Sequence, residues 1–219
     1  MIQEIEEYIK QILPPGKVYP GHDWKHAFRV RNWALKIAKG EGYEDVIILC
    51  VAALLHDIGR LREKEFKKQH AGVSAQMVEE YLKDKDWFSQ KEEEELLYAI
   101  AHHSKGGEGQ LVAILQDADR LDGFGAMGIV RIMQPKWYLP DYDPASIVNP
   151  FVLSKKEIDD FYIAEPQGDM LSYAVDYIPY LISWFDYMNT KTGKELAEPL
   201  VEYSKQFLEQ LNREVGNDN

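Results

Sequence analysis

The 219-residue sequence has a single cysteine, Cys50, and no long run of apolar residues. One cysteine excludes a scaffold held together by disulfides and a zinc site built from four thiolates. The longest apolar run, Val46 to Leu55, has ten residues, whereas a helix that spans a bilayer needs about 20. The acidic N-terminus also lacks the pattern of a secretory signal peptide. We therefore expect a cytoplasmic protein that does not enter the membrane.

Basic residues are also scarce. Lys and Arg number 25 against 37 Asp and Glu, which gives a formal net charge of −12. A protein with this charge has no general attraction for a nucleic-acid polymer or an anionic membrane, because both require a basic face. A small anionic substrate is still compatible with the composition, provided that a metal ion and a few local cations hold it. The hydrophobic content of 45% provides for a sizeable core, and the length suits one domain over residues 1–219.

No window shows the sustained alternation of a β-strand, and helical periodicity dominates the chain. Asp23 is a good N-cap, and Ser89 with Glu92 forms a capping-box pattern. The pattern predicts an all-α fold, a helical bundle with a core over about 20–133 and a helical extension over about 135–219. The first six helices are expected over residues 2–13, 23–39, 45–57, 70–83, 89–103 and 110–133. Four prolines indicate an ordered loop over residues 135–150.

Histidine is absent from the second half of the chain, since all six histidines lie at or before residue 103. His56 and Asp57 end the most apolar helix, where an ionised carboxylate is costly unless a cation compensates it. His26 lies on the inward face of the preceding helix, and Asp119 lies on the inward face of a later one. Two imidazoles and two carboxylates suit a divalent Mn, Fe, Mg, Co, Ni or Zn ion, with positions left open for water and substrate. This set predicts a catalytic metal site.

The ordered set His26, His56-Asp57 and Asp119 resembles the H…HD…D signature of the HD-domain superfamily of metal-dependent phosphohydrolases. The resemblance covers about residues 20–133 and includes the neighbouring motifs His22-Asp23-x-x-His26, His102-His103-Ser104 and Asp117-Ala118-Asp119. The C-terminal stretch from Met188 through Gly193 to Glu214 is similar to the tail of the small stand-alone members of that superfamily. The resemblance implies that His26, His56, Asp57 and Asp119 are metal ligands. It also implies hydrolysis of a phosphoester or phosphoanhydride bond in a nucleotide or another small phosphate compound.

Further roles are expected around this metal. Asp57 would hold the attacking water with its second oxygen, and His102, His103 or Asp122 would act as proton donor, as support for a ligand or at a second metal. Charge on the phosphoryl group calls for nearby cations. The candidates for binding the substrate are Arg29, Arg60, His70, Lys105 and Arg120.

Two alternatives stay open at this point. Some proteins of the HD fold hold two irons and oxidise a C–H bond with O₂, and His70 with His102 or His103 would supply the additional ligands. A regulatory module that binds a metal or a nucleotide is the other alternative, although the complete ligand set argues against a vestigial site. The Gly-Tyr-Pro element of the cyclic-dinucleotide phosphodiesterases is absent, which argues against that substrate. A mononucleotide or nucleoside triphosphate is favoured, with Trp137, Tyr138 and Tyr142 available to stack on a base.

Overall fold

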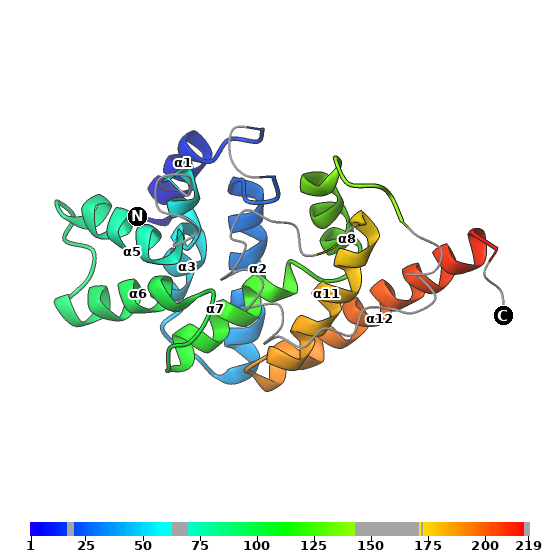
Figure 1. The fold of residues 1–219 in the computed structure, drawn as a ribbon. Helices are drawn as coiled ribbons and strands as arrows, with labels where there is room; N and C mark the ends of the chain where they lie inside the picture. Colours follow the sequence, from blue (N-terminus) through cyan, green and yellow to red (C-terminus); the bar gives the residue numbers. More distant parts are fainter. Residues whose placement is uncertain (17–19, 63–69, 143–170, 172, 217–219) are drawn as a thin grey trace. The chain divides into compact units, whose positions relative to one another are not determined.

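The computed structural model describes residues 1–16, 20–62, 70–142, 171 and 173–216 (Figure 1). Within these ranges the chain forms α-helices and short 3₁₀ helices and contains no β-strand. The predicted all-α fold is therefore confirmed. No helix in this part of the chain has the length and apolar character that a membrane crossing requires.

The described chain divides into two compact units. The first unit comprises residues 1–122 together with 188–194, and the second comprises 123–187 together with 195–219. The helices of the first unit are α1 (Ile2–Ile12), α2 (Trp24–Glu41), α3 (Val46–Leu55), the 3₁₀ helix η1 (Ile58–Arg62), α5 (His70–Leu82), α6 (Gln90–His102) and α7 (Gln110–Leu121).

Helix α3 is the centre of the first unit. Each of its ten residues is apolar, and residues 51–55 are all buried. It packs against α1, α2, α6 and α7, which enclose its C-terminal half, whereas Val46 and Ile47 at its start are exposed. A helix that is apolar all round is stable only when it is surrounded in this way. Because the last turn of α3 is buried, the residues that follow it, His56 and Asp57, lie in the interior of the unit.

The helix ends follow the signals in the sequence. The side chain of Asp23 accepts hydrogen bonds from the backbone N–H groups of Lys25 and His26, as an N-cap does. Ser89 and Glu92 form the predicted capping box at the start of α6. Helix α2 ends at Gly42, whose φ of 67° lies in the left-handed region that glycine adopts without strain.

The second unit contains α8 (Gly125–Met133), η2 (Gln134–Lys136), η3 (Ala174–Asp176), α11 (Tyr177–Ser183), η4 (Trp184–Tyr187) and most of α12 (Lys191–Glu214). The prediction of one helix over residues 110–133 is wrong, because the chain forms α7 and α8 with a break after Leu121. Gly125 has a φ of 65°, a left-handed conformation that interrupts a right-handed helix. At Gly128, a Cβ atom would collide with the backbone carbonyl of Gly123.

The aromatic residues predicted to stack on a base belong to the second unit. Trp137 is 83% exposed, and Tyr138 and Tyr142 are also exposed. Residues 143–150 of the predicted proline-rich loop lie outside the described residues. Base stacking by these three side chains remains a prediction.

Candidate metal centre

The first unit brings the four predicted metal ligands together at one place. His26 comes from α2, His56 and Asp57 directly follow α3, and Asp119 comes from α7. The Nε2 atom of His26 lies 3.3 Å from Asp119 Oδ1 and 3.6 Å from Asp57 Oδ2. The Nε2 atom of His56 lies 3.7 Å from Asp57 Oδ2 and 3.9 Å from Asp119 Oδ1. Ligand atoms bonded to one ion at about 2.1 Å lie about 3 to 3.4 Å apart, so these separations are close to those of a shared cation.

The hydrogen bonds of the histidines determine which ring nitrogen faces this cluster. His26 Nδ1 lies 2.7 Å from Asp122 Oδ2, and His56 Nδ1 lies 2.9 Å from the carbonyl oxygen of Ala53. Carboxylate and carbonyl oxygens only accept hydrogen bonds, so each Nδ1 carries the donated proton. In the neutral form of each ring, the Nε2 atom therefore presents a lone pair toward the two carboxylates.

This arrangement of acceptors fits a divalent cation. Burial lowers the pKa of His56 to about 4, so its ring is neutral at neutral pH. His56 Nε2 and Asp57 Oδ1 are both buried and have no hydrogen-bond partner among the described residues. Buried acceptors without a donor are costly. A cation bound by the cluster offsets that cost, and the donor set has the composition of a catalytic metal site.

Both carboxylates are ionised at neutral pH. Burial by itself would raise the pKa of Asp57, but the charge of Arg60 and the nearby imidazoles outweigh it, and the pKa lies well below its ordinary value. Burial opposes ionisation of Asp119 as well, and its contact with His26 and the proximity of His56 hold the pKa well below its ordinary value. The site therefore presents two negative charges to a cation.

A second group of side chains lies on the other oxygen of Asp57. His70 Nε2 and His103 Nε2 lie 3.5 Å and 3.6 Å from Asp57 Oδ1, and 3.2 Å from each other. The hydroxyl of Ser104 lies 3.2 Å from the first of these nitrogens and 3.3 Å from the second. His103 donates its Nδ1 proton to the carbonyl of Ile100 at 2.7 Å. The predicted residues His70 and His103 thus lie beside the predicted metal ligand Asp57, and Ser104 lies with them although sequence reasoning assigned it no role.

Residues 23–123 match the family model of the HD domain. This part of the chain is an HD domain. The whole chain is also similar to a curated protein of Bacillus subtilis (strain 168), the uncharacterized protein YpgQ, with 27% identity over 97% of this chain and 93% of the relative.

Solved structures agree with this family. The structure of an HD-superfamily hydrolase from Bacillus thuringiensis has 28% sequence identity and a TM-score of 0.70. The match covers 100% of this chain and 97% of the chain of that structure. The structure of Bacillus subtilis YpgQ in complex with ADP has a TM-score of 0.62 at 24% identity, with 98% and 95% of the two chains covered. At that identity the second likeness shows the fold alone.

Asp122 contacts the imidazole of His26, one of the four predicted metal ligands. In addition to the hydrogen bond from His26, its carboxylate accepts hydrogen bonds from Arg29 Nε at 2.6 Å and from Arg29 Nη2 at 3.0 Å. A carboxylate that accepts the far ring proton of a metal-binding histidine fixes the tautomer and orientation of that ring. Arg29, predicted to bind substrate, directs its guanidinium at this carboxylate.

The remaining predicted residues differ in where their side chains lie. Arg60 reaches the site, where its Nε donates to Asp57 Oδ2 at 3.0 Å. Arg120 instead pairs with Asp117 at 3.1 Å, and Lys105 is exposed with no hydrogen bond or ion pair to the described residues. His102 points away from the cluster, since its ring lies against Tyr98 with the centroids 4.2 Å apart and its Nδ1 donates to the Tyr98 carbonyl.

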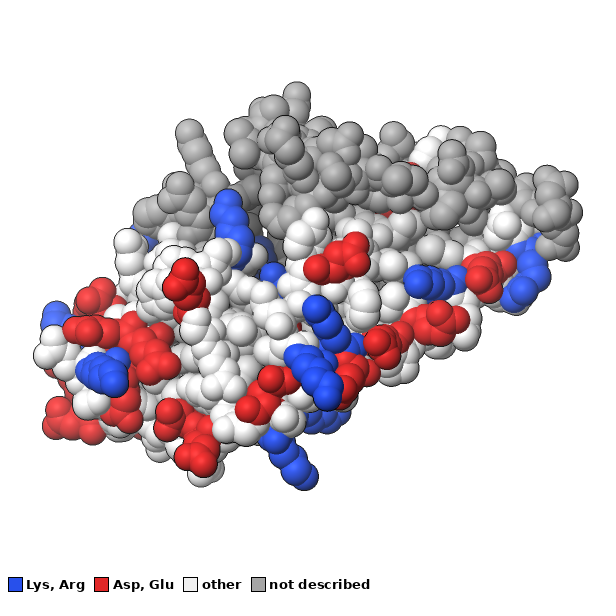
Figure 2. All heavy atoms as spheres, turned by 90° about the horizontal axis from the view of Figure 1, so that it is seen from below, with Lys and Arg blue, Asp and Glu red and all other residues white. Residues whose placement is uncertain are grey.

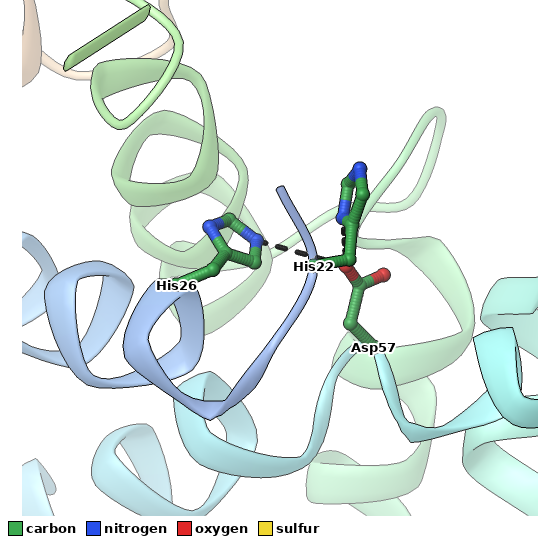
Figure 3. A group of neighbouring side chains, drawn as sticks. All are labelled: His22, His26 and Asp57. Carbon is green, nitrogen blue, oxygen red and sulfur yellow. Dashed lines mark hydrogen bonds and ion pairs between the residues drawn. The ribbon is translucent and has the colours of Figure 1, made fainter. Parts of the chain in front are cut away.

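His22 is a member of the site that sequence reasoning did not single out. It lies in the loop before α2, and its Nδ1 is 2.5 Å from Asp57 Oδ2 (Figure 3). Because this residue is not helical, the periodicity of the following helix does not show where its side chain points. The available signal was its position four residues before His26 in the motif His22-Asp23-x-x-His26.

Proposed function

We propose that this protein is a metal-dependent phosphohydrolase that releases phosphate or pyrophosphate from a nucleotide or another small phosphate compound. The observation that carries the proposal is the convergence of His26, His56, Asp57 and Asp119, with buried acceptor atoms that face one another. These four residues would hold one divalent ion. Its identity is one of Mn, Fe, Mg, Co, Ni and Zn.

A bound divalent ion would lower the pKa of a water molecule and polarise a phosphoryl oxygen. The residues of the chain supply the other requirements of the reaction. Asp57 Oδ1 is free to accept a hydrogen bond from the attacking water, because no described residue donates to it. The guanidinium of Arg60 places a positive charge beside the ligands, where it offsets the negative charge of a phosphoryl group. His70, His103 and Ser104 lie next to the same oxygen and can donate to the substrate or the leaving group.

Two observations support a nucleotide as the substrate. The structure of the similar Bacillus subtilis protein YpgQ contains ADP. In addition, the net charge of −12 gives no long-range attraction for a polyanion, so a compact substrate whose phosphates are met locally is favoured over a nucleic-acid chain.

The positions of His70 and His103 favour a second candidate function, a di-iron oxygenase. Both imidazoles lie within 3.6 Å of Asp57 Oδ1, so that Asp57 could bridge two ions. Arg60 argues against it, because its guanidinium lies 3.4 Å from His70 Nε2 and 3.0 Å from Asp57 Oδ2. A second divalent ion there would be repelled by this fixed positive charge. We therefore favour one ion per chain.

The test is a phosphate-release assay that compares a variant of the predicted metal ligand His56 with a variant of His102, whose ring lies outside the cluster. Protein purified without chelator is analysed for metal and then assayed on a panel of nucleotides and non-nucleotide phosphates. His56→Ala is expected to lower turnover by about two orders of magnitude or more, the scale of losing a key electrostatic group. His102→Ala is expected to stay within about twofold, because that ring lies on Tyr98. Two iron ions per chain together with consumption of O₂ would instead establish the oxygenase. Faster turnover of non-nucleotide phosphates than of nucleotides would refute the nucleotide assignment.

A further inference from the structure

His22 contacts a metal ligand without belonging to the four-residue ligand set. Figure 3 shows its ring above Asp57, on the side of the carboxylate that carries Oδ2, with His26 across the gap. The ring centroids of His22 and His26 lie 5.2 Å apart, edge to face. The His22 side chain is 19% exposed, whereas Asp57 is buried. A polar ring is thus placed between solvent and a buried carboxylate.

The direction of this hydrogen bond follows from chemistry. Asp57 is ionised and can only accept, so Nδ1 of His22 is the donor. An imidazole that carries a proton on Nδ1 donates in this direction whether the ring is neutral or protonated, so the 2.5 Å contact itself carries the assignment. The contact of 2.5 Å is short for a bond between a nitrogen donor and a carboxylate.

The two oxygens of Asp57 are consequently in different surroundings. Oδ2 accepts from His22 and from Nε of Arg60, the latter at 3.0 Å. Oδ1 has no hydrogen-bond partner among the described residues and faces His103 at 3.6 Å. A carboxylate held through one oxygen cannot rotate freely about its Cβ–Cγ bond. The donors on Oδ2 therefore fix the position of this oxygen, which lies 3.6 Å from His26 Nε2 and 3.7 Å from His56 Nε2 in the cluster of predicted metal ligands.

We propose that His22 is a positioning residue that orients the Asp57 carboxylate through its Nδ1–H group, and that this orientation sets the affinity of the site for its metal ion. The proposal rests on the metal site of the proposed function. It does not require His22 to bind the metal, to touch the substrate or to transfer a proton. Partners that orient a ligand in this way typically account for 10- to 100-fold in metal affinity.

Two amide substitutions of His22 test whether the position of the hydrogen-bond donor matters or only the presence of a polar side chain. The amide nitrogen of asparagine takes the place of the histidine Nδ1 atom, so His22→Asn keeps the donor. The amide nitrogen of glutamine takes the place of Nε2, so His22→Gln keeps a polar side chain but moves the donor away. Both variants are measured by calorimetric titration of chelator-stripped protein with Mn²⁺, and their folding is checked by circular dichroism in EDTA.

The expected result is that His22→Gln weakens Mn²⁺ binding by about 10- to 100-fold, whereas His22→Asn stays within about threefold of the wild type. Equal affinity of His22→Gln and the wild type would overturn the proposal. It would also fail if His22→Asn were as weak as His22→Gln, because the imidazole itself would then be required.

The titration separates this proposal from the proposed function. A wild type that binds Mn²⁺ tightly but releases no phosphate from any compound would refute the phosphohydrolase and leave the role of His22 intact. A wild type that binds no divalent ion would refute both. In an active enzyme, His22→Gln is expected to raise the Mn²⁺ concentration for half-maximal activity and to restore the turnover number at saturating Mn²⁺. A loss of turnover that saturating metal does not restore would contradict a positioning role.

Discussion

Asp117 carries a buried charge that the proposed chemistry does not use, and its replacement by asparagine tests what holds α7 in place. The carboxylate is 0% exposed and accepts from residues 188–194, the C-terminal segment that belongs to the first unit. The backbone N–H and side-chain amide of Asn189 donate at 2.8 Å and 3.0 Å, and the backbone N–H and hydroxyl of Thr190 donate at 2.7 Å and 2.8 Å. Arg120 adds an ion pair at 3.1 Å.

The magnitude follows from these contacts. Asp117→Asn keeps the shape of the side chain but removes the charge and turns one acceptor into a donor that faces other donors. Breaking a buried charged network costs about 3 to 5 kcal/mol. For a chain of this length, each kcal/mol shifts the melting temperature by about 2 to 4 °C. We therefore expect Asp117→Asn to melt about 10 °C below the wild type.

Urea unfolding followed by far-ultraviolet circular dichroism in EDTA measures the change in the free energy of unfolding. The matched control is Asp84→Asn, because Asp84 is exposed and is expected to change stability by less than about 0.5 kcal/mol. If Asp117→Asn is within about 1 kcal/mol of the wild type, the reasoning about residues 188–194 is wrong. A loss of the expected size would show that this segment, which lies beyond the HD-domain match, stabilises the helix that carries Asp119.

Four further outcomes are expected. Gly59→Ala should lower the melting temperature and the activity in a thermal-shift and turnover assay, because a Cβ there collides with the backbone of His70 and Ser74; an unchanged melting temperature would contradict the close approach. Asp122→Asn should weaken metal binding by about 10- to 100-fold in a titration, and wild-type affinity would rule out its support of the nearby imidazole. Chelation should lower the melting temperature by about 5 to 10 °C if the metal was present at about 100 times its Kd, whereas no shift would mean that the ion does not bind the folded site. His103→Ala should reduce turnover at least tenfold more than His102→Ala, and the reverse order would contradict the placement of the two rings.

Most helices of the first unit, and the inward positions of His26 and Asp119, could be predicted from the sequence, because they depend on local signals. The apolar run before His56 and Asp57 indicated a central helix, and a buried carboxylate at its end indicated a compensating cation. Asp23 and Ser89 marked helix starts through short-range capping, which the structure shows in the same form. Periodicity placed His26 and Asp119 on inward helix faces, and the resemblance to the HD-domain superfamily implied the full set of four ligands.

The roles that depend on long-range pairing could not be predicted in the same way. Arg29 was a candidate for substrate binding because of its charge, but its partner Asp122 lies 93 positions away in the sequence. His102 and His103 are adjacent, and only the packing of α6 determines which ring enters the site. The break between α7 and α8 depends on the left-handed conformation of Gly125, which a helical hydrophobic pattern does not reveal.

Charged side chains of both signs cover the face of the molecule that Figure 2 shows. In the face shown in Figure 2, acidic side chains gather mainly on the left, and basic side chains are interspersed with acidic ones elsewhere. This mixture agrees with the composition of 37 acidic and 25 basic residues. Among the residues that the structure describes, Arg60 donates a side-chain hydrogen bond to Asp57. Net charge therefore predicts the absence of polyanion binding, but it does not identify the residue that meets a phosphate.

The most direct test of a phosphohydrolase with one ion per chain is a titration of metal-stripped protein with Mn²⁺, with phosphate and pyrophosphate release from nucleotides as the signal. The account predicts no release without metal, activation that is complete at one equivalent of tightly bound ion, and at least about 100-fold less release by His56→Ala at every metal concentration. Release by the stripped wild type, or equal release by His56→Ala, would contradict it.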